Sequence, residues 1–216
     1  MISVRDVSKR FRDQQALKAV SAEFESGKIT GVIGRNGSGK TVLLKCVIGL
    51  MKPDHGEIIV NGLRVGKDVD FVEDVGFIIN RPGFLDDMSG YRNLRYLAAI
   101  RKKIGTLEIR NIIQLVGLDP YNRKHVGKYS MGMKQRLGIA QALMEQPSIV
   151  ILDEPMSGLD NEGVRQMRAL FKDLRSQGKT LVITSHNSED IDELCDTVFH
   201  MDRGALNPRE PSSHRV

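Results

Sequence analysis

A glycine-rich run constrains the fold of this 216-residue chain more than any other feature: Gly34-Arg35-Asn36-Gly37-Ser38-Gly39-Lys40-Thr41. Residues 29–34 before it have the apolar pattern of a buried strand, and residues 40–50 are apolar nearly all round, as in an enclosed helix. A strand, a glycine turn and a buried helix in direct succession call for a sheet covered by helices. The sequence therefore predicts an α/β protein.

The run also has a chemical meaning, because it matches G-x-x-x-x-G-K-[ST] between a predicted strand and a predicted helix. Glycines let the backbone curl until its N–H groups converge on phosphate oxygens, and the helix N-terminus adds positive partial charge. Lys40 would reach the β- and γ-phosphates, and the Thr41 hydroxyl would bind Mg²⁺. We predict a nucleotide-binding P-loop made of Gly34, Arg35, Asn36, Gly37, Ser38, Gly39, Lys40 and Thr41.

The remaining patterns predict a mixed or parallel sheet flanked by helices, with an antiparallel portion and a helical insert. Asn61-Gly62 suits the type I′ turn of a hairpin over residues 57–65. Further strands are expected at 75–79, 148–152, 180–184 and 197–201, and an amphipathic helix at 162–177. We expect one domain over residues 1–206, a helical subdomain at about 85–145, and a frayed tail at 207–216.

Helix signals mark the proposed insert. Ser89 and Thr106 are expected N-caps, and Gly105 and Gly117 are expected just past helix ends. Ser130 should cap a further helix over residues 131–144.

Composition and charge limit the function classes. The chain is 40% hydrophobic and 27% charged, which excludes a disordered or disulfide-stapled protein, and its two cysteines suggest a reducing compartment. It shows no leader pattern and no apolar run near the ~20 residues that cross a bilayer, so we expect a cytoplasmic protein. The net charge of +5 comes from interspersed signs, which favours a mixed, solvated surface over a nucleic-acid partner.

An acidic pair and a histidine complete the predicted site. Asp153-Glu154 ends a short apolar strand, so that Asp153 can hold Mg²⁺ while Glu154 polarises an attacking water. His186 follows another strand, at the sheet edge where open α/β proteins bind ligands. We expect it to contact the γ-phosphate.

With these motifs in order, the sequence resembles the ATP-binding cassette (ABC) family from about residue 2 to 204. Tyr129-Ser130-Met131-Gly132-Met133-Lys134-Gln135-Arg136 looks like the family's signature motif, and Ser157-Gly158-Leu159-Asp160 is similar to its D-loop. His186 falls at the switch histidine, and Phe11 at the aromatic that stacks on adenine.

The resemblance implies that two cassettes sandwich two ATP molecules head to tail. In such a pair, Ser130 and Gly132 of one subunit would face the γ-phosphate bound by the other, with Asp160 nearby. A second ABC ATPase subunit is therefore an expected partner, and an identical chain would make the pair a homodimer.

Two departures from the family pattern are visible. Asn80 stands where the family has a glutamine, and its side chain is one methylene shorter, which puts its contact with magnesium or water in question. Met131 and Met133 replace a glycine and a glutamine of the signature, whereas Ser130 and Gly132 are kept.

Residues 129–144, and residues 76–94 with their Pro-Gly-Phe turn, look most like cassettes that energise polytopic exporters of drugs and antimicrobial peptides. A separate permease would then hold the chain at the inner face of the membrane and dock on residues 80–91, unless Phe84 and Leu85 tuck against the helical insert instead. One alternative is a soluble ABC ATPase acting on DNA or ribosomes, which usually carries a coiled coil or a second cassette. The other is a P-loop kinase of small metabolites, which would need an acceptor pocket and a lid.

Overall fold

A six-stranded sheet forms the centre of the molecule, in a computed structural model that describes residues 1–80 and 82–209. Its strands run in the order β10-β9-β3-β8-β7-β6. The five parallel strands are β3 (Ile29–Ile33), β6 (Val75–Ile78), β7 (Ile149–Leu152), β8 (Thr180–Ser185) and β9 (Thr197–Asp202). Strand β10 (Ala205–Arg209) adds an antiparallel edge, so the predicted mixed sheet is confirmed.

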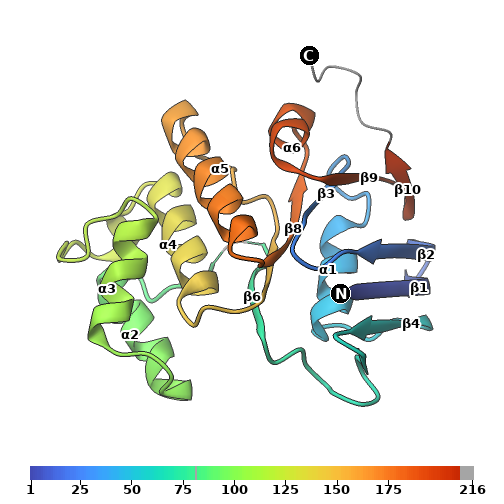
Figure 1. Cartoon of the computed structure of the whole chain (residues 1–216), viewed down its shortest axis with the longest axis horizontal. Helices are drawn as coiled ribbons and strands as arrows, with labels where there is room; N and C mark the ends of the chain where they lie inside the picture. Colours follow the sequence, from blue (N-terminus) through green and yellow to red (C-terminus); the bar gives the residue numbers. More distant parts are fainter. Residues whose placement is uncertain (81, 210–216) are drawn as a thin grey trace.

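A second sheet of four antiparallel strands lies to the right in Figure 1, in the order β2-β1-β4-β5. These strands are β1 (Ile2–Phe11), β2 (Gln14–Phe24), β4 (His55–Val60) and β5 (Leu63–Arg64). The predicted hairpin is confirmed, with positive φ at Asn61 (51°) and Gly62 (85°). Strands β1 and β2 were not predicted, because register shifts between Val4 and Arg10 interrupt the two-residue alternation by which a strand is recognised.

Helix α1 (Lys40–Ile48) packs between the two sheets, and the other helices cover the opposite face of the central sheet. Because side chains alternate along a strand, Ile149 and Ile151 of β7 join the core around α1, whereas Val150 and Leu152 face the other helices. The glycine-rich loop joins the end of β3 directly to α1, so the start of α1 lies at the edge where the parallel strands end. The predicted site should form at this edge.

The helices of that opposite face fall into two groups. Helices α2 (Gly90–Arg101), α3 (Thr106–Leu115) and α4 (Met131–Leu143) lie together at the left of Figure 1, far from the antiparallel sheet, with a 3₁₀ turn at Val126–Lys128 before α4. Helices α5 (Asn161–Ser176) and α6 (Ser188–Leu194) stand closer to β8. Helix α6 was not predicted.

The predicted caps of the insert are partly correct. Ser89 caps α2 by accepting the Arg92 N–H at 3.3 Å, and Gly117 (φ 76°) follows the end of α3. Thr106 and Gly105 were assigned wrongly. Lys102 ends α2 in the left-handed region, and Gly105 itself caps α3, with its N–H donating to the Glu108 carboxylate at 3.0 Å. This contact is the half of a capping box in which the acidic side chain of the first turn accepts the N–H of the cap residue.

The predicted tail begins too early. Residues 207–209 belong to β10, whose backbone pairs with β9, and the Arg209 guanidinium donates to the Asp192 carboxylate at 3.0 and 3.1 Å. Residues 210–216 of that tail, and Arg81 within the predicted docking segment 80–91, lie outside the described residues.

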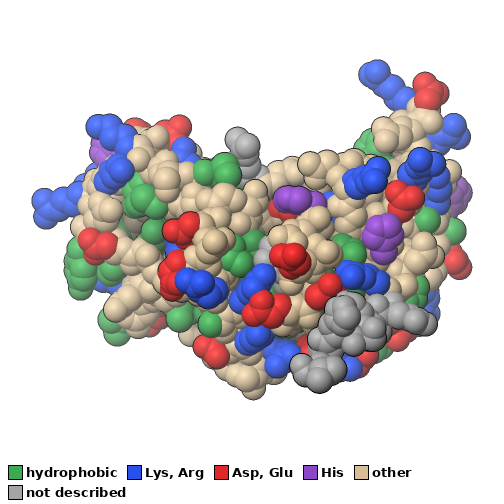
Figure 2. All heavy atoms as spheres, turned by 90° about the horizontal axis from the view of Figure 1, so that it is seen from above, with side chains coloured by type: hydrophobic (Ala, Val, Ile, Leu, Met, Phe, Trp, Pro, Cys, Tyr) green, Lys and Arg blue, Asp and Glu red, His purple; other side chains and the backbone are tan. Residues whose placement is uncertain are grey.

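The surface and the helices bear on the remaining expectations. On the face seen in Figure 2, basic and acidic side chains are interspersed, in agreement with the mixed surface expected from the sequence. Within the described ranges 1–80 and 82–209, no helix combines the length and apolar character that a membrane crossing needs.

Candidate functional site

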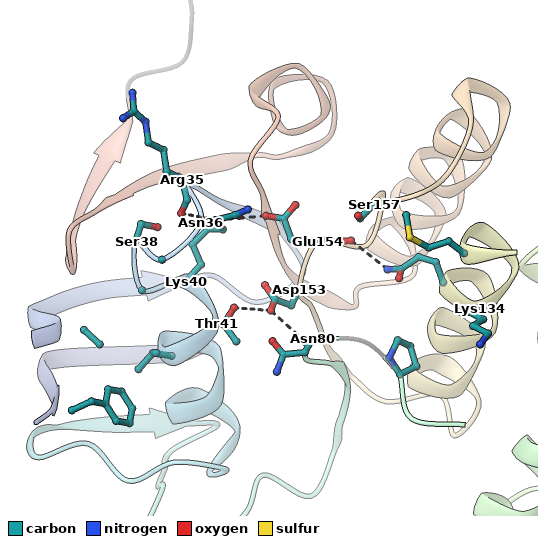
Figure 3. Close-up of a pocket in the computed structure, with 18 of the residues that line it drawn as sticks. Arg35, Asn36, Ser38, Lys40, Thr41, Asn80, Lys134, Asp153, Glu154 and Ser157 are labelled. Atoms are coloured by element: carbon teal, nitrogen blue, oxygen red, sulfur yellow. Dashed lines mark hydrogen bonds and ion pairs between the residues drawn. The ribbon is translucent and has the colours of Figure 1, made fainter. Parts of the chain in front are cut away.

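A cavity of about 910 Å³ opens at the carboxyl edge of the central sheet, and the predicted phosphate loop lines it. Its wall contains these predicted residues: Phe11, Arg35, Asn36, Gly37, Ser38, Gly39, Lys40, Thr41, Asn80, Asp153 and Glu154. Figure 3 shows Lys40, Thr41, Asn80 and Asp153 converging from the start of α1 and from two strand ends. Most of the residues predicted to bind nucleotide within one chain are thus brought to one cavity.

The phosphate loop curls as its glycines allow. Gly37 (φ 78°) and Gly39 (φ 117°) both adopt positive φ, and a Cβ on Gly39 would lie 2.5 Å from the Ala16 carbonyl oxygen. The buried Lys40 ammonium group donates to the carbonyl oxygens of Gly34, at 2.6 Å, and Arg35, at 3.3 Å. Carbonyl oxygens of the loop therefore bind the Lys40 ammonium group, and phosphate oxygens could replace them as its hydrogen-bond partners.

Asp153 is held from two sides. The Thr41 hydroxyl donates to its Oδ2 at 2.8 Å, and the Thr184 hydroxyl donates to its Oδ1 at 2.6 Å. The backbone N–H of Asn80 also approaches Oδ2, at 3.5 Å. A hydroxyl and a carboxylate oxygen side by side are the hard donors that Mg²⁺ prefers, and a nucleotide's phosphates would supply further oxygen ligands. The residues present fit this ion.

Glu154 faces the same cavity with one oxygen engaged and one available. Its Oε2 lies 2.7 Å from Nδ1 of His186, which the sequence placed at the neighbouring strand end. Its Oε1 is buried, lies 3.5 Å from the Lys40 ammonium group, and has no hydrogen-bond partner among the described residues. A buried carboxylate oxygen without a hydrogen-bond partner retains its capacity to accept one.

The outer rim of the cavity is more apolar. Phe11 is 44% exposed, and the Lys9 ammonium group stands 5.8 Å from the centre of its ring. Across the cavity the wall comes from residues at the start of α4 and just before it, among them Tyr129, Met131 and Lys134. Burial raises the pKa of the Tyr129 hydroxyl, so this side chain stays neutral near neutral pH.

Five predicted residues are not among those that line the cavity. Gly34 and His186 contact residues that do line it, namely Lys40 and Glu154, and the other three lie at helix starts. Ser130 caps α4 by accepting the Met133 N–H at 3.2 Å, and Asp160 caps α5 by accepting the Gly163 N–H at 2.8 Å. Gly132 packs against the loop before α5, where a Cβ would come within 2.9 Å of the Gly158 carbonyl oxygen. Within one chain these residues organise helix starts near the site.

Two residues of the site were missed by the sequence prediction. Thr184 joins Asp153 to the Glu154 backbone, and Gln135 donates to the Glu154 carbonyl oxygen at 3.3 Å. A threonine at the polar end of an apolar run was a usable signal for the first. No local pattern marks Gln135, because its partner Glu154 lies in another part of the fold, at the end of β7.

The family model for the ABC transporter matches residues 17–157 of this sequence, more than half of the chain. The chain belongs to the ABC transporter family. An ABC transporter ATP-binding protein of Bacillus subtilis, YybJ, is 40% identical over 97% of this chain and 96% of its own. The bacitracin transport ATP-binding protein BcrA of Bacillus licheniformis is 36% identical over 99% of this chain and 71% of its own.

The fold agrees with this membership. A dimeric bacterial ABC transporter cassette superposes with a TM-score of 0.86 at 23% identity, covering 95% of this chain and 96% of that one. The chain is thus an ATP-binding subunit of an ABC transporter, and its activity is ATP hydrolysis coupled to transport. Subunits of this family pair with one another and work with membrane components. The DNA, ribosome and kinase alternatives are not favoured.

Proposed function

We propose that this subunit drives a separate membrane permease that exports a drug, a peptide or a similar compound. The observation that carries the mechanism is the cavity in which Lys40, Asp153 and Glu154 meet. The similarity to a bacitracin transport protein supports the class of cargo. The cassette extends through β10, with helices α2 to α4 as a helical insert.

ATP occupies the cavity with its adenine ring stacked on Phe11 and its phosphates in the loop. The exposed ring of Phe11 leaves one face available for stacking. Lys40 and the loop N–H groups bind the β- and γ-phosphates. Thr41 and Asp153 would hold Mg²⁺, with Asn80 beside them at the strand end. The ion, when bound, neutralises charge that develops on the phosphate oxygens.

Glu154 acts as the general base of hydrolysis. Its Oε1 accepts a hydrogen bond from the water that attacks the γ-phosphorus atom, and the products are ADP and phosphate. His186 contacts the other carboxylate oxygen, which orients the carboxylate, and its exposed ring can reach the γ-phosphate. The two residues therefore share the side of the site where the bond breaks.

A second copy of the chain completes the site. Ser130 and Gly132 stand at the N-terminus of α4, where a hydroxyl, free N–H groups and the helix dipole favour an anion. In a head-to-tail pair this end would meet the γ-phosphate bound by the partner, with the Asp160 loop beside it. ATP then closes the pair because its phosphates bind the closed state better than the open one.

The permease docks on residues 80–91, next to the site. In this segment Phe84 packs against the helical core, whereas Leu85 is 46% exposed and available for a contact. Because the segment starts at Asn80 in the cavity wall, closure and opening of the pair can reach the permease at the inner face of the membrane.

Replacing Lys40 with alanine tests the nucleotide site. The loss of its charge-assisted contacts should weaken ATP binding by at least about 100-fold and abolish hydrolysis. Isothermal titration with ATP and a phosphate-release assay measure the two effects. Lys45→Ala, on the last turn of the same helix, is the control and should bind ATP like the parental chain. Unaltered affinity in Lys40→Ala would remove Lys40 from the site.

Purification of the tagged subunit from its native membrane tests the partner. We expect a polytopic membrane protein to co-purify, and its loss on replacing Leu85 with aspartate would support the docking segment. ATPase activity that rises with DNA or ribosomes, without any membrane partner, would contradict the proposal.

A further inference from the structure

The backbone of Glu154 is strained. Its φ of 52° lies in the left-handed region that residues with side chains rarely adopt. Pro155 follows it and restricts the preceding residue further. Such a conformation persists only where neighbouring contacts hold it.

Contacts from two parts of the fold hold this peptide. The Glu154 N–H donates to Oγ1 of Thr184 at 2.9 Å, and Thr184 is fully buried in β8. On the other side, Nε2 of Gln135 in α4 donates to the Glu154 carbonyl oxygen at 3.3 Å. The same carbonyl accepts the Ser157 N–H at 3.1 Å, which closes a local turn. The turn can therefore form without Gln135, and what Gln135 adds is a link to α4.

The position of Gln135 gives this link its significance. It lies about one and a half turns after Ser130 in the same helix, and it is only 9% exposed. It also lines the cavity together with Glu154. Its amide therefore connects α4, the helix that Ser130 caps, to Glu154, whose carboxylate is the proposed base.

We propose that Gln135 is a positioning residue for Glu154, which makes the placement of the carboxylate depend on the position of α4. This rests on the proposed role of Glu154 as general base. A small displacement of a reacting group lowers the rate steeply. Because Ser130 is proposed to meet the partner's nucleotide, closure of the pair and placement of the base are linked through one side chain.

The test is a double-mutant cycle in the full-length chain. Gln135→Met keeps the length of the side chain and removes its donor. We expect kcat to fall about fivefold while KM for ATP changes by less than about twofold. In a Glu154→Gln background the same substitution should have no further effect, because the base that Gln135 positions is gone. An equal loss in both backgrounds would indicate a merely structural role and overturn the proposal.

Further variants keep the result decisive. Gln135→Glu preserves the shape but replaces the donor with an acceptor, so it should lose turnover even if the methionine variant fails to fold. Gln141→Met is the matched control in the same helix, because the Gln141 Oε1 has no hydrogen-bond partner among the described residues, and it should keep the parental kcat. Parental kcat in both Gln135 variants, or an equal loss in Gln141→Met, would overturn the proposal.

Lys40→Ala, measured in parallel, separates the two levels of inference. If Lys40→Ala hydrolyses ATP like the parental chain, the proposed function fails. If it is inactive while the Gln135 variants keep the parental rate, only the role of Gln135 fails.

Discussion

The two ends of the proposed ATP site differ in how far a single chain completes them. At the sheet edge, side chains from the start of α1 and from two neighbouring strands hold one another: Thr41 and Thr184 both donate to Asp153. At the start of α4, the Ser130 hydroxyl accepts an N–H of its own helix, and the neighbouring Met131 is 55% exposed. The first end is organised within one fold, and the second faces outward.

The difference indicates which steps each end controls. Groups held in place by the sheet can bind nucleotide and orient water within one subunit. In the proposed pair, the end at Ser130 contributes to turnover only when another subunit brings a phosphate to it. Substitutions at the two ends should therefore separate binding and chemistry from pairing.

Glu154→Gln should give the largest effect. Loss of the general base should lower turnover by about 10² to 10⁴ while ATP still binds. The variant should accumulate as a closed pair, because closure depends on phosphate contacts that it keeps. Single-turnover kinetics and size-exclusion chromatography with ATP measure both results.

The nearby exposed Glu189→Gln is the control for that substitution and should hydrolyse ATP at the parental rate. A parental rate in Glu154→Gln would show that another group activates the water. The side chains named at the sheet edge would then not account for hydrolysis.

The two buried thiols report on how tightly the core on either face of the central sheet is packed. Burial raises the pKa of Cys46 to about 11, and burial together with Asp196 raises that of Cys195 to about 12. At pH 8 a thiol with its ordinary pKa of about 8.5 is roughly a quarter ionised, whereas one at about 11 is about 0.1% ionised. Reaction with a disulfide reagent should therefore be at least about 10² slower in the folded chain than in guanidinium chloride.

Leu107→Cys places a matched reporter on α3, where the leucine is 67% exposed. This thiol should react at nearly the rate of a free cysteine. Rapid reaction of Cys46 or Cys195 in the folded protein would mean that the core around the central sheet is as accessible to the reagent as the exposed surface of α3.

Ser130 substitutions should have the smallest effect and bear most directly on pairing. Ser130→Ala removes both the proposed contact with the partner's phosphate and a helix cap, so we expect turnover to fall about tenfold and stability by about 1 kcal/mol. Affinity of an isolated subunit for ATP should stay within about twofold of the parental value, since the serine is not among the residues lining its own cavity.

Ser130→Asp distinguishes the two roles of the hydroxyl. Aspartate caps a helix as well as serine does, so thermal unfolding should occur near the parental temperature. Its carboxylate would repel the phosphate, and turnover should fall further than in the alanine variant. Parental turnover in Ser130→Asp would leave Ser130 with a capping role alone.

Much of the fold and site follows from short segments of sequence. The P-loop, the hairpin turn at Asn61-Gly62 and the acidic pair at Asp153 are local patterns whose chemistry depends on residues a few positions apart. Strands β1 and β2 could not be found in this way, because bulges break their alternation. The end of α2 at Lys102 was also missed, since local rules place glycine or asparagine in the left-handed region.

The sequence by itself determined the family, the phosphate loop and the two carboxylates that line the same cavity, because each depends on a motif that the chain carries in order. Only the tertiary structure decided that Thr184 and Gln135 hold the peptide of Glu154, since these residues approach it from a strand and a helix far apart in sequence. The physical reason is that a buried hydrogen bond depends on distance and direction in space, which the packing of α4 against the sheet sets.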